Sequence, residues 1–171
     1  CGNGVADVLT GKVCACGKLT DTIAGNISYY PSTENFGDPF QNYYKEDIYV
    51  GYRYFETFAK DKVLYPFGYG LSYTNFETKA EIFKNTEDEL TVSATVTNTG
   101  SVKGKEVVQV YVKVPQGTLG NPARKLIGFA KTQELDPGER EELMIIIPKY
   151  DMASYDDSGV TGHRSCYVLE S

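Results

Sequence analysis

The stretch ELTVSATVTNTG, residues 89–100, decides the fold because its polarity changes at every step from Glu89 to Thr97. Apolar side chains occupy every second position: Leu90, Val92, Ala94 and Val96. Hydroxyl-bearing side chains fill the positions between them: Thr91, Ser93, Thr95 and Thr97. Successive side chains of a strand point to opposite faces, so the stretch predicts a β-strand with the first set in a core and the second facing solvent. We expect Asn98-Thr99-Gly100 to form the turn that follows it.

The same alternation recurs on both sides of this stretch. It is found in FETKAEIF (residues 76–83), EVVQVYVKVP (106–115), KLIGFAKTQEL (125–135) and REELMIIIP (140–148). In the second of these, one face carries Val108, Val110, Val112 and Val114. Asp136-Pro137-Gly138 is a strong turn signal between the last two. Short alternating strands at this spacing predict a mainly β fold, an Ig-like β-sandwich over residues 73–171.

The two ends of the chain differ from this pattern. Near the N-terminus, Val5, Val8 and Leu9 share one helical face and Gly11 provides a stop signal, which predicts one short helix. A lone helix and the extended piece after it cannot bury themselves, so residues 1–25 are interpreted as the edge of another domain. The final stretch, residues 152–171, is loop-rich, and we expect the last strand of the sandwich to be missing.

Residues 26–72 are irregular in pattern and rich in aromatic side chains. Two segments stand out, DIYVGYRYFETF (residues 47–58) and VLYPFGYGLSYTNFE (63–77). If the first is extended, Ile48, Val50 and Tyr52 fall on one side. Tyrosine rings can stack on sugars, but glycines beside rings also permit close packing against protein. We favour the packing interpretation, in which residues 26–72 cross between domains and their rings hold two domains together.

Composition excludes several classes of function. The formal net charge is −6 and the basic pair Arg124-Lys125 is small, which argues against binding to nucleic acid or to an anionic membrane surface. No apolar run approaches the roughly 20 residues of a membrane span. The cysteines are Cys1, Cys14, Cys16 and Cys166. We interpret them as free thiols, which favours a reducing, cytoplasmic compartment, and we expect neither a metal site nor a cofactor.

Candidate catalytic residues are few. His163 is the only histidine and lies in a Gly- and Ser-rich loop typical of solvated side chains, so an acid-base role is not expected. Glycosidases use paired carboxylates. The acidic runs here occur in turns or at strand ends: Glu87-Asp88-Glu89, Glu141-Glu142 and Asp156-Asp157. They are interpreted as solvated surface, and no catalytic residue is assigned.

Three groups of motifs resemble the family 3 glycoside hydrolases, the β-glucosidase group. DIYVGYRYFETF and LYPFGYGLSYTNFE resemble the signature that joins the last two domains of that family. GNGVADVLTGKVCACGKL resembles the end of its α/β sandwich domain, with Gly17-Lys18-Leu19 kept and the flanking residues changed. GKEVVQVYVKVP and RKLIGFAKTQELDPGEREEL resemble its fibronectin type III-like domain. The motifs fall in the family's order over nearly the whole chain.

The resemblance implies a parent enzyme that hydrolyses terminal β-D-glucosides or related β-glycosides with retention of configuration. It divides the chain into the terminal piece of an α/β sandwich domain (1–25), a crossing segment (26–72) and a fibronectin type III-like domain (73–171). The family's nucleophile is an aspartate of a barrel domain, and its acid/base is a glutamate upstream in the α/β domain; neither motif is present. Glu46 matches a family glutamate that is usually followed by Gly, but Asp47 follows here, and Glu46 is given no catalytic role.

The resemblance therefore implies a non-catalytic, structural portion that braces the catalytic domains. Those α/β sandwich and barrel domains are the expected partners, in cis or as a separate chain. The residues expected to form an inter-domain clasp are Tyr52, Arg53, Tyr54, Phe55, Phe67, Tyr69, Leu71 and Tyr73. Tyr43 and Tyr44 are candidates for the edge of the substrate site. The alternative is a carbohydrate-binding module with the tyrosines as a stacking surface; an adhesion-type Ig-like domain would not explain the clasp motifs.

Overall fold

The computed structural model describes residues 1–115 and 117–170 and divides into two compact units. The sandwich unit consists of Cys1–Lys18, Gly70–Val110 and Leu126–Asp151. The aromatic unit consists of Leu19–Tyr69, Tyr111–Lys125 and Met152–Ser171, apart from residues 116 and 171. Each unit is therefore assembled from three separate stretches of chain. The division into domains 1–25, 26–72 and 73–171 stays a prediction.

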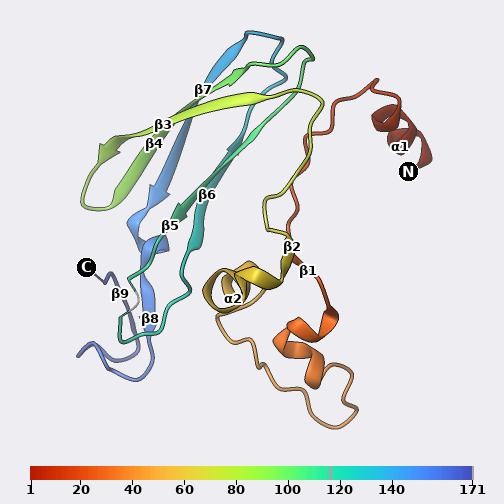
Figure 1. Ribbon diagram of the computed structural model, residues 1–171. Coiled ribbons are helices and arrows are strands. Elements are labelled where there is room, and N and C mark those ends of the chain that lie inside the picture. Colours follow the sequence, from red (N-terminus) through yellow and green to blue (C-terminus); the bar gives the residue numbers. More distant parts are fainter. Residues whose placement is uncertain (116, 171) are drawn as a thin grey trace. The chain divides into compact units, whose positions relative to one another are not determined.

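Long antiparallel strands form the sandwich unit, as the alternating pattern predicts. Its larger sheet has the order β3 (Phe76–Asn85), β4 (Glu89–Asn98) and β7 (Arg140–Pro148) (Figure 1). A second pair consists of β5 (Val107–Val112) and β6 (Lys125–Lys131). The mainly β class is confirmed, and so is the turn before β7, where Gly138 has the positive φ of 83°.

The core of the sandwich unit lies on one face of β4 and β7. Val92, Ala94 and Val96 of β4 are buried, as predicted, together with Ile145 and Ile147 of β7. Gly128 of β6 lies directly against this face, since a Cβ atom there would stand 2.9 Å from Ile145 Cγ2. The close approach of β6 to β7 therefore requires glycine at this position.

The other face of β4 differs from the prediction. Thr91 and Ser93 were expected to face solvent, but each is only 5% exposed. The reason is that β4 is the middle strand, so each of these short side chains lies between cross-strand partners from β3 and β7. The Ser93 hydroxyl donates a hydrogen bond of 2.7 Å to Glu142 Oε1 on β7. The alternation of polar and apolar residues thus predicted the strand correctly, but it did not predict that the polar face is buried.

Asn98 belongs to β4 and not to the turn that follows it, which corrects a second expectation. It ends β4 and is completely buried. Its side-chain NH₂ donates to the carbonyl oxygens of Val102 and Leu135 at 2.8 and 2.9 Å. Its Oδ1 accepts from Thr74 Oγ1 at 2.7 Å. One amide therefore satisfies the polar groups of three separate loops, and the chain turns only after it.

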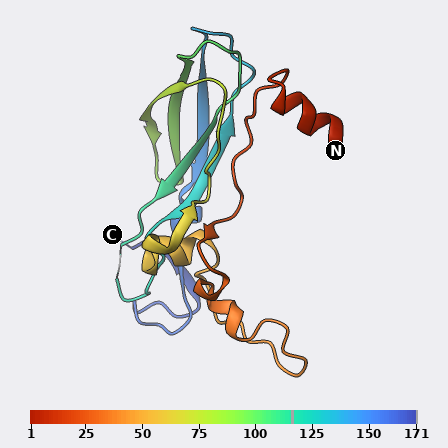
Figure 2. The same cartoon turned by 45° about the vertical axis from the view of Figure 1, so that its right-hand side comes forward.

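The predicted N-terminal helix is present as α1 (Gly2–Leu9), the coil at the start of the chain in Figure 2. Gly11 follows it with a φ of 73°, as its stop signal predicted. The side chains of Val5 and Leu9 are exposed. The Tyr73 hydroxyl donates to the Val8 carbonyl oxygen at 2.8 Å and fixes the C-terminal turn of α1 within the sandwich unit.

Short elements build the aromatic unit. Two antiparallel pairs consist of β1 (Ile23–Ala24) with β2 (Val63–Tyr65) and β8 (Ser154–Asp156) with β9 (Cys166–Val168). One α-helix, α2, spans Tyr52–Phe58. The 3₁₀ helices are η1 (Ile27–Tyr29), η2 (Pro31–Glu34) and η3 (Lys60–Lys62), while η4 (Lys149–Met152) begins in the sandwich unit.

Asp156, at the end of β8, organises the loop that leads to β9. Its side chain is fully buried and accepts hydrogen bonds from the hydroxyl and the amide of Thr161 at 2.6 and 2.9 Å. The amides of Ser158 and Gly159 add bonds of 3.1 and 2.6 Å. The Thr161 hydroxyl is the main cause that lowers the pKa of Asp156, with the backbone amides adding to it. Asp156 is therefore a loop anchor and not solvated surface, whereas Asp157 is exposed as expected.

Candidate functional site

Helix α2 occupies the middle of the aromatic unit and corrects the extended reading of residues 47–58. Gly51 precedes it with a φ of 58°, a conformation that favours glycine and that turns the chain into the helix. The Thr57 hydroxyl donates to the Arg53 carbonyl oxygen at 2.6 Å, one helical turn back. Tyr52 therefore belongs to a helical face and does not share a strand face with Ile48 and Val50.

Phe55 is the buried centre of this unit. It is 1% exposed and is the largest fully buried side chain of the described chain. The ring of Tyr30 meets it edge-on, with centroids 5.1 Å apart and an interplanar angle of 82°. The Tyr54 ring does the same from within α2, at 5.3 Å and 80°. Such perpendicular pairs are the arrangement that aromatic quadrupoles favour.

A second group of rings surrounds Tyr52. Its ring packs against Phe67 with centroids 4.7 Å apart and against Tyr111 at 6.1 Å. The Arg53 guanidinium lies 6.0 Å from the centre of the same ring. The two aromatic motifs of the sequence are thus joined directly, through Tyr52 of the first and Phe67 of the second.

Charged groups extend this contact to the loop before β6. The Arg124 guanidinium stands over the Tyr111 ring at 4.7 Å and pairs with Glu56 of α2 at 2.6 Å. Glu56 also pairs with Lys60 at 3.1 Å. The Ala123 amide donates to Thr57 Oγ1 at 2.9 Å. Burial raises the pKa of Tyr111, and the Arg124 guanidinium opposes this with a smaller effect. These contacts fasten α2 to residues 111–125.

The structure brings together most, but not all, of the residues predicted for the clasp. Those of the aromatic unit are Tyr52, Arg53, Tyr54, Phe55, Phe67 and Tyr69. Tyr69 lies slightly apart and packs on Tyr65, with centroids 5.1 Å apart. Leu71 and Tyr73 belong to the sandwich unit, where Leu71 is 73% exposed. The clasp as an inter-domain contact stays a prediction.

The candidates for the substrate edge lie in the loop before α2. Tyr43 and Tyr44 are both exposed, Tyr44 to 92%. Asp47, the residue that stands where the family usually has Gly, has a φ of 47°. This left-handed conformation is one that glycine adopts without strain, so the backbone at Asp47 would favour glycine.

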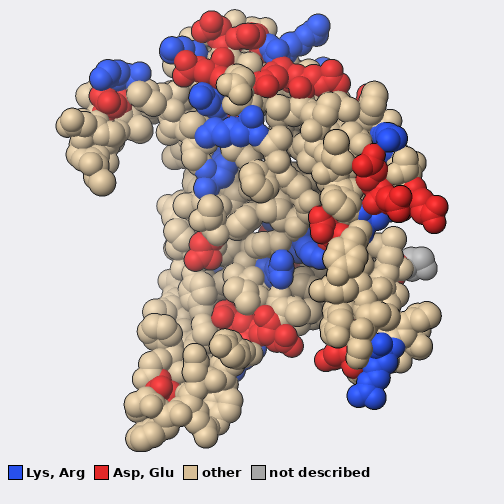
Figure 3. Space-filling view, turned by 180° about the vertical axis from the view of Figure 1, so that it is seen from behind, with Lys and Arg blue, Asp and Glu red and all other residues tan. Residues whose placement is uncertain are grey.

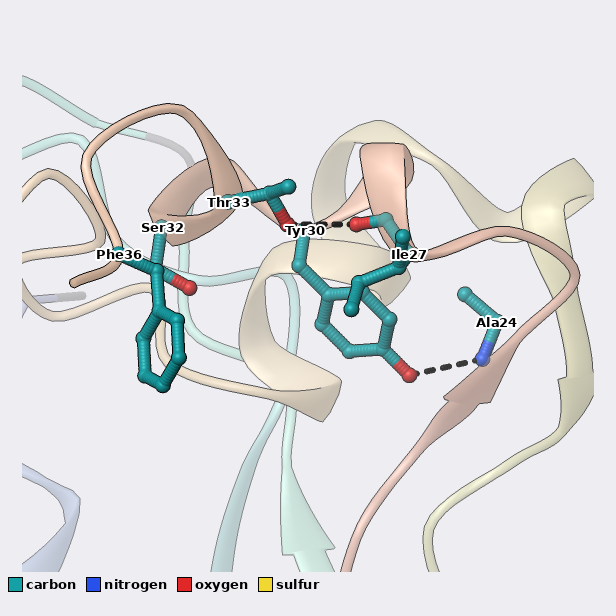
Figure 4. A pocket seen from close by; sticks show the side chains of 6 residues that line it. All are labelled: Ala24, Ile27, Tyr30, Ser32, Thr33 and Phe36. Atoms are coloured by element: carbon teal, nitrogen blue, oxygen red, sulfur yellow. Dashed lines mark hydrogen bonds between the residues drawn. The ribbon is translucent and has the colours of Figure 1, made fainter.

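A hollow of about 520 Å³ opens beside Tyr30. Figure 4 shows the six side chains that line it: Ala24, Ile27, Tyr30, Ser32, Thr33 and Phe36. The Tyr30 hydroxyl donates to the Thr22 carbonyl oxygen at 2.8 Å and accepts from the Ala24 amide at 2.9 Å. The Thr33 hydroxyl donates to the Ile27 carbonyl oxygen at 2.6 Å. The wall of the hollow is thus fixed by its own hydrogen bonds.

Sequence reasoning missed Tyr30, Glu56, Tyr111 and Arg124. Arg124 was considered only as part of a small basic pair, and its partner Glu56 lies 68 positions away in the sequence. Tyr111 alternates correctly within a strand pattern, which gave no sign of its contact with Tyr52. Only the high frequency of Tyr and Phe across residues 26–72 indicated that a ring cluster existed.

Two features are absent from the part of the chain that the structure describes. Across residues 1–115 and 117–170, no group of three or more His, Cys, Asp or Glu side chains is placed to hold a metal ion. In the same residues, no helix has the length and apolar character needed to cross a membrane.

Comparison with known proteins identifies the wider context of these contacts. Residues 106–167 match the family model of the fibronectin type III-like domain. A β-glucosidase of Ruminococcus albus is 54% identical over 99% of this chain, which covers 18% of that protein. The crystal structure of a β-glucosidase from Paenibacillus barengoltzii superposes with a TM-score of 0.93 at 58% identity, over 99% of this chain and 19% of that one. Residues 106–167 match a fibronectin type III-like domain, and nearly the whole chain is similar to one part of these β-glucosidases.

The resemblance expected from the motifs is therefore confirmed. β-Glucosidase 3B from Thermotoga neapolitana, solved in complex with glucose, superposes with a TM-score of 0.82 at 45% identity, over 90% of this chain and 22% of that one. The chain spans about a fifth of the length of the relatives it matches. In these family 3 relatives the matched stretch is accordingly one part of a longer polypeptide.

Proposed function

We propose that this chain is a non-catalytic part of a β-glucosidase-type enzyme and that it braces the catalytic domains of its parent. The parent would hydrolyse terminal β-D-glucosides or related β-glycosides with retention of configuration. One observation carries the proposal. The match to the Ruminococcus albus β-glucosidase covers 99% of this chain but only 18% of the length of that protein.

The ring cluster supports a bracing role over carbohydrate binding. A stacking surface for sugars needs open ring faces, but Tyr52 packs on Phe67 and Tyr111, and Phe55 is buried. The exposed rings of Tyr43 and Tyr44 are the better candidates for contact with a substrate held by the catalytic domains. In this proposal, the interior of the aromatic unit keeps its loops rigid while those loops meet the parent.

An activity assay tests the proposal directly. The 171-residue chain is assayed with p-nitrophenyl β-D-glucoside alone and after mixing with the separately produced remainder of the parent. We expect no turnover from either part alone and activity on mixing. Turnover by the chain alone would overturn the non-catalytic assignment, and failure of the two parts to associate would overturn the bracing role.

A further inference from the structure

The hollow beside Tyr30 has an apolar mouth with no covering. Ile27 and Phe36 line it, yet their side chains are 75% and 88% exposed. The neighbouring loop adds Phe40 and Tyr44, each 92% exposed. Soluble proteins rarely leave so many large apolar side chains open within one short segment, and such patches mark interaction sites.

The hollow is preformed and its back wall is rigid. The Tyr30 ring rests on buried Phe55, and its hydroxyl is held between the Thr22 carbonyl and the Ala24 amide. Asn26 accepts from the Ser28 amide at 2.9 Å and fixes the start of η1. A partner would therefore meet a shaped surface, which limits the ordering cost of binding.

The chemistry of the lining indicates what kind of group would fit. Of its three hydroxyls, those of Tyr30 and Thr33 already donate to backbone carbonyls within the wall, as the dashed lines of Figure 4 illustrate for Thr33. Ser32 supplies the third. A glucosyl unit carries several hydroxyls, and each one buried without a partner costs about 1–3 kcal/mol. The lining therefore favours an apolar side chain over a sugar.

The uncharged lining of the hollow also favours an apolar side chain over a sugar. None of the six lining residues carries a charge. The segment that is orange in Figure 1 shows mostly uncharged surface on the face seen in Figure 3. A second hollow of about 300 Å³ shares Ser32 and Phe36 with the first, so Phe36 stands between the two. Lys45, Glu46 and Asp47 line only the second hollow.

We infer that the Tyr30 hollow receives an apolar side chain from another domain of the same parent polypeptide. The inference rests on the proposed function and specifies its contact surface. The length of the relatives supports a side chain from the same polypeptide. The Ruminococcus albus β-glucosidase is about five times as long as the stretch that matches this chain, so it has further surface that could cover these rings. Ile27 and Phe36 are the wall residues that would grip the incoming side chain.

Binding of the 171-residue chain to the separately produced remainder of the parent tests the inference. The variants are Phe36→Ser and Ile27→Ser, with Phe83→Ser as the matched control, since Phe83 is 63% exposed on β3 of the sandwich unit. Titration calorimetry gives the affinity, and thermal melts check that each variant folds. We expect Phe36→Ser to weaken binding about tenfold or more, as for a buried interface ring, and Phe83→Ser by less than about threefold.

The possible results distinguish a failure of the inference from a failure of the proposed function on which it rests. If the unmodified chain binds and restores activity but Phe36→Ser binds equally well, the hollow is not the contact and the inference fails alone. If the unmodified chain does not bind, both fail together. Saturable binding of cellobiose that Phe36→Ser abolishes would overturn the inference in favour of a sugar site. A dimer of the chain that the same variant dissociates would overturn it in favour of a second copy.

Discussion

Replacing Phe55 by Ala measures how strongly the aromatic unit depends on its central ring. A phenylalanine side chain buries on the order of 150–200 Å². At about 25 cal/mol per Å² this corresponds to about 4–5 kcal/mol. Phe55 is 1% exposed, so nearly all of that contact is present, and truncation also leaves a cavity beside Tyr30. Alanine is a better helix former by about 0.5 kcal/mol, which offsets part of the loss.

We therefore expect Phe55→Ala to lower the free energy of unfolding by about 3.5–4.5 kcal/mol. Urea unfolding followed by far-UV circular dichroism gives the total. Amide hydrogen exchange resolved to residues 23–65 locates the loss within the aromatic unit. The matched control is Phe58→Ala, because Phe58 occupies the same helix but is 61% exposed. Its loss is expected to stay below about 1.5 kcal/mol.

Two results would refute this reasoning. A loss below about 1 kcal/mol for Phe55→Ala would mean that the ring is not packed as the structure shows. Equal losses for Phe55→Ala and Phe58→Ala would mean that burial does not separate the two positions. Either result would remove the support that the ring cluster gives to a rigid contact surface.

Three further predictions concern single side chains. Asn98→Ala should lower the free energy of unfolding by about 3 kcal/mol, measured in urea, because it leaves two loop carbonyls without donors; a loss near zero would contradict this. Asp156 has a lowered pKa, so its carboxylate stabilises the fold above the unfolded-state value of about 3.9, and that contribution is lost as pH falls through the folded-state pKa. The Asp156→Asn variant should therefore be less stable than the unmodified chain at pH 7, and its stability should decline less steeply below about pH 4. The measurement is the melting temperature as a function of pH. Identical curves for the two proteins would exclude the anchor role of Asp156. Asp47→Gly removes a side chain at a φ of 47° and should raise the free energy of unfolding by up to about 1 kcal/mol. The control Asp61→Gly in η3 should lower the free energy of unfolding. A change of the same sign in both variants would show that the backbone at Asp47 is not strained.

The strands could be predicted because their signal is local. Residues 89–97 alternate without a break, and β4 covers them. The turn at Asp136-Pro137-Gly138 depends on residue types that favour one backbone conformation, and Gly138 adopts it. Alternation does not indicate whether a strand lies at the edge or in the middle of its sheet. For this reason Thr91 and Ser93 were expected to face water, although both are buried.

The ring cluster could be predicted only in outline, since its contacts link distant parts of the sequence. The composition of residues 26–72 indicated packed rings, and Tyr52 does pack on Phe67. The polar half of the site, in which Arg124 pairs with Glu56, has no local signature. The exposed segment around Phe36 was interpreted as an irregular crossing, and its preformed hollow depends on hydrogen bonds that composition does not specify.

The assembly of the aromatic unit from three stretches has a consequence for synthesis on the ribosome. Residues 19–69 emerge first, but their partners in residues 111–125 and 152–171 follow much later. At about 5–20 residues per second, the ring-bearing segment would wait several seconds before its last strand pair exists. During that interval Tyr52 lacks Tyr111 and Glu56 lacks Arg124, so the unit is incomplete and its apolar side chains are targets for chaperones and for aggregation.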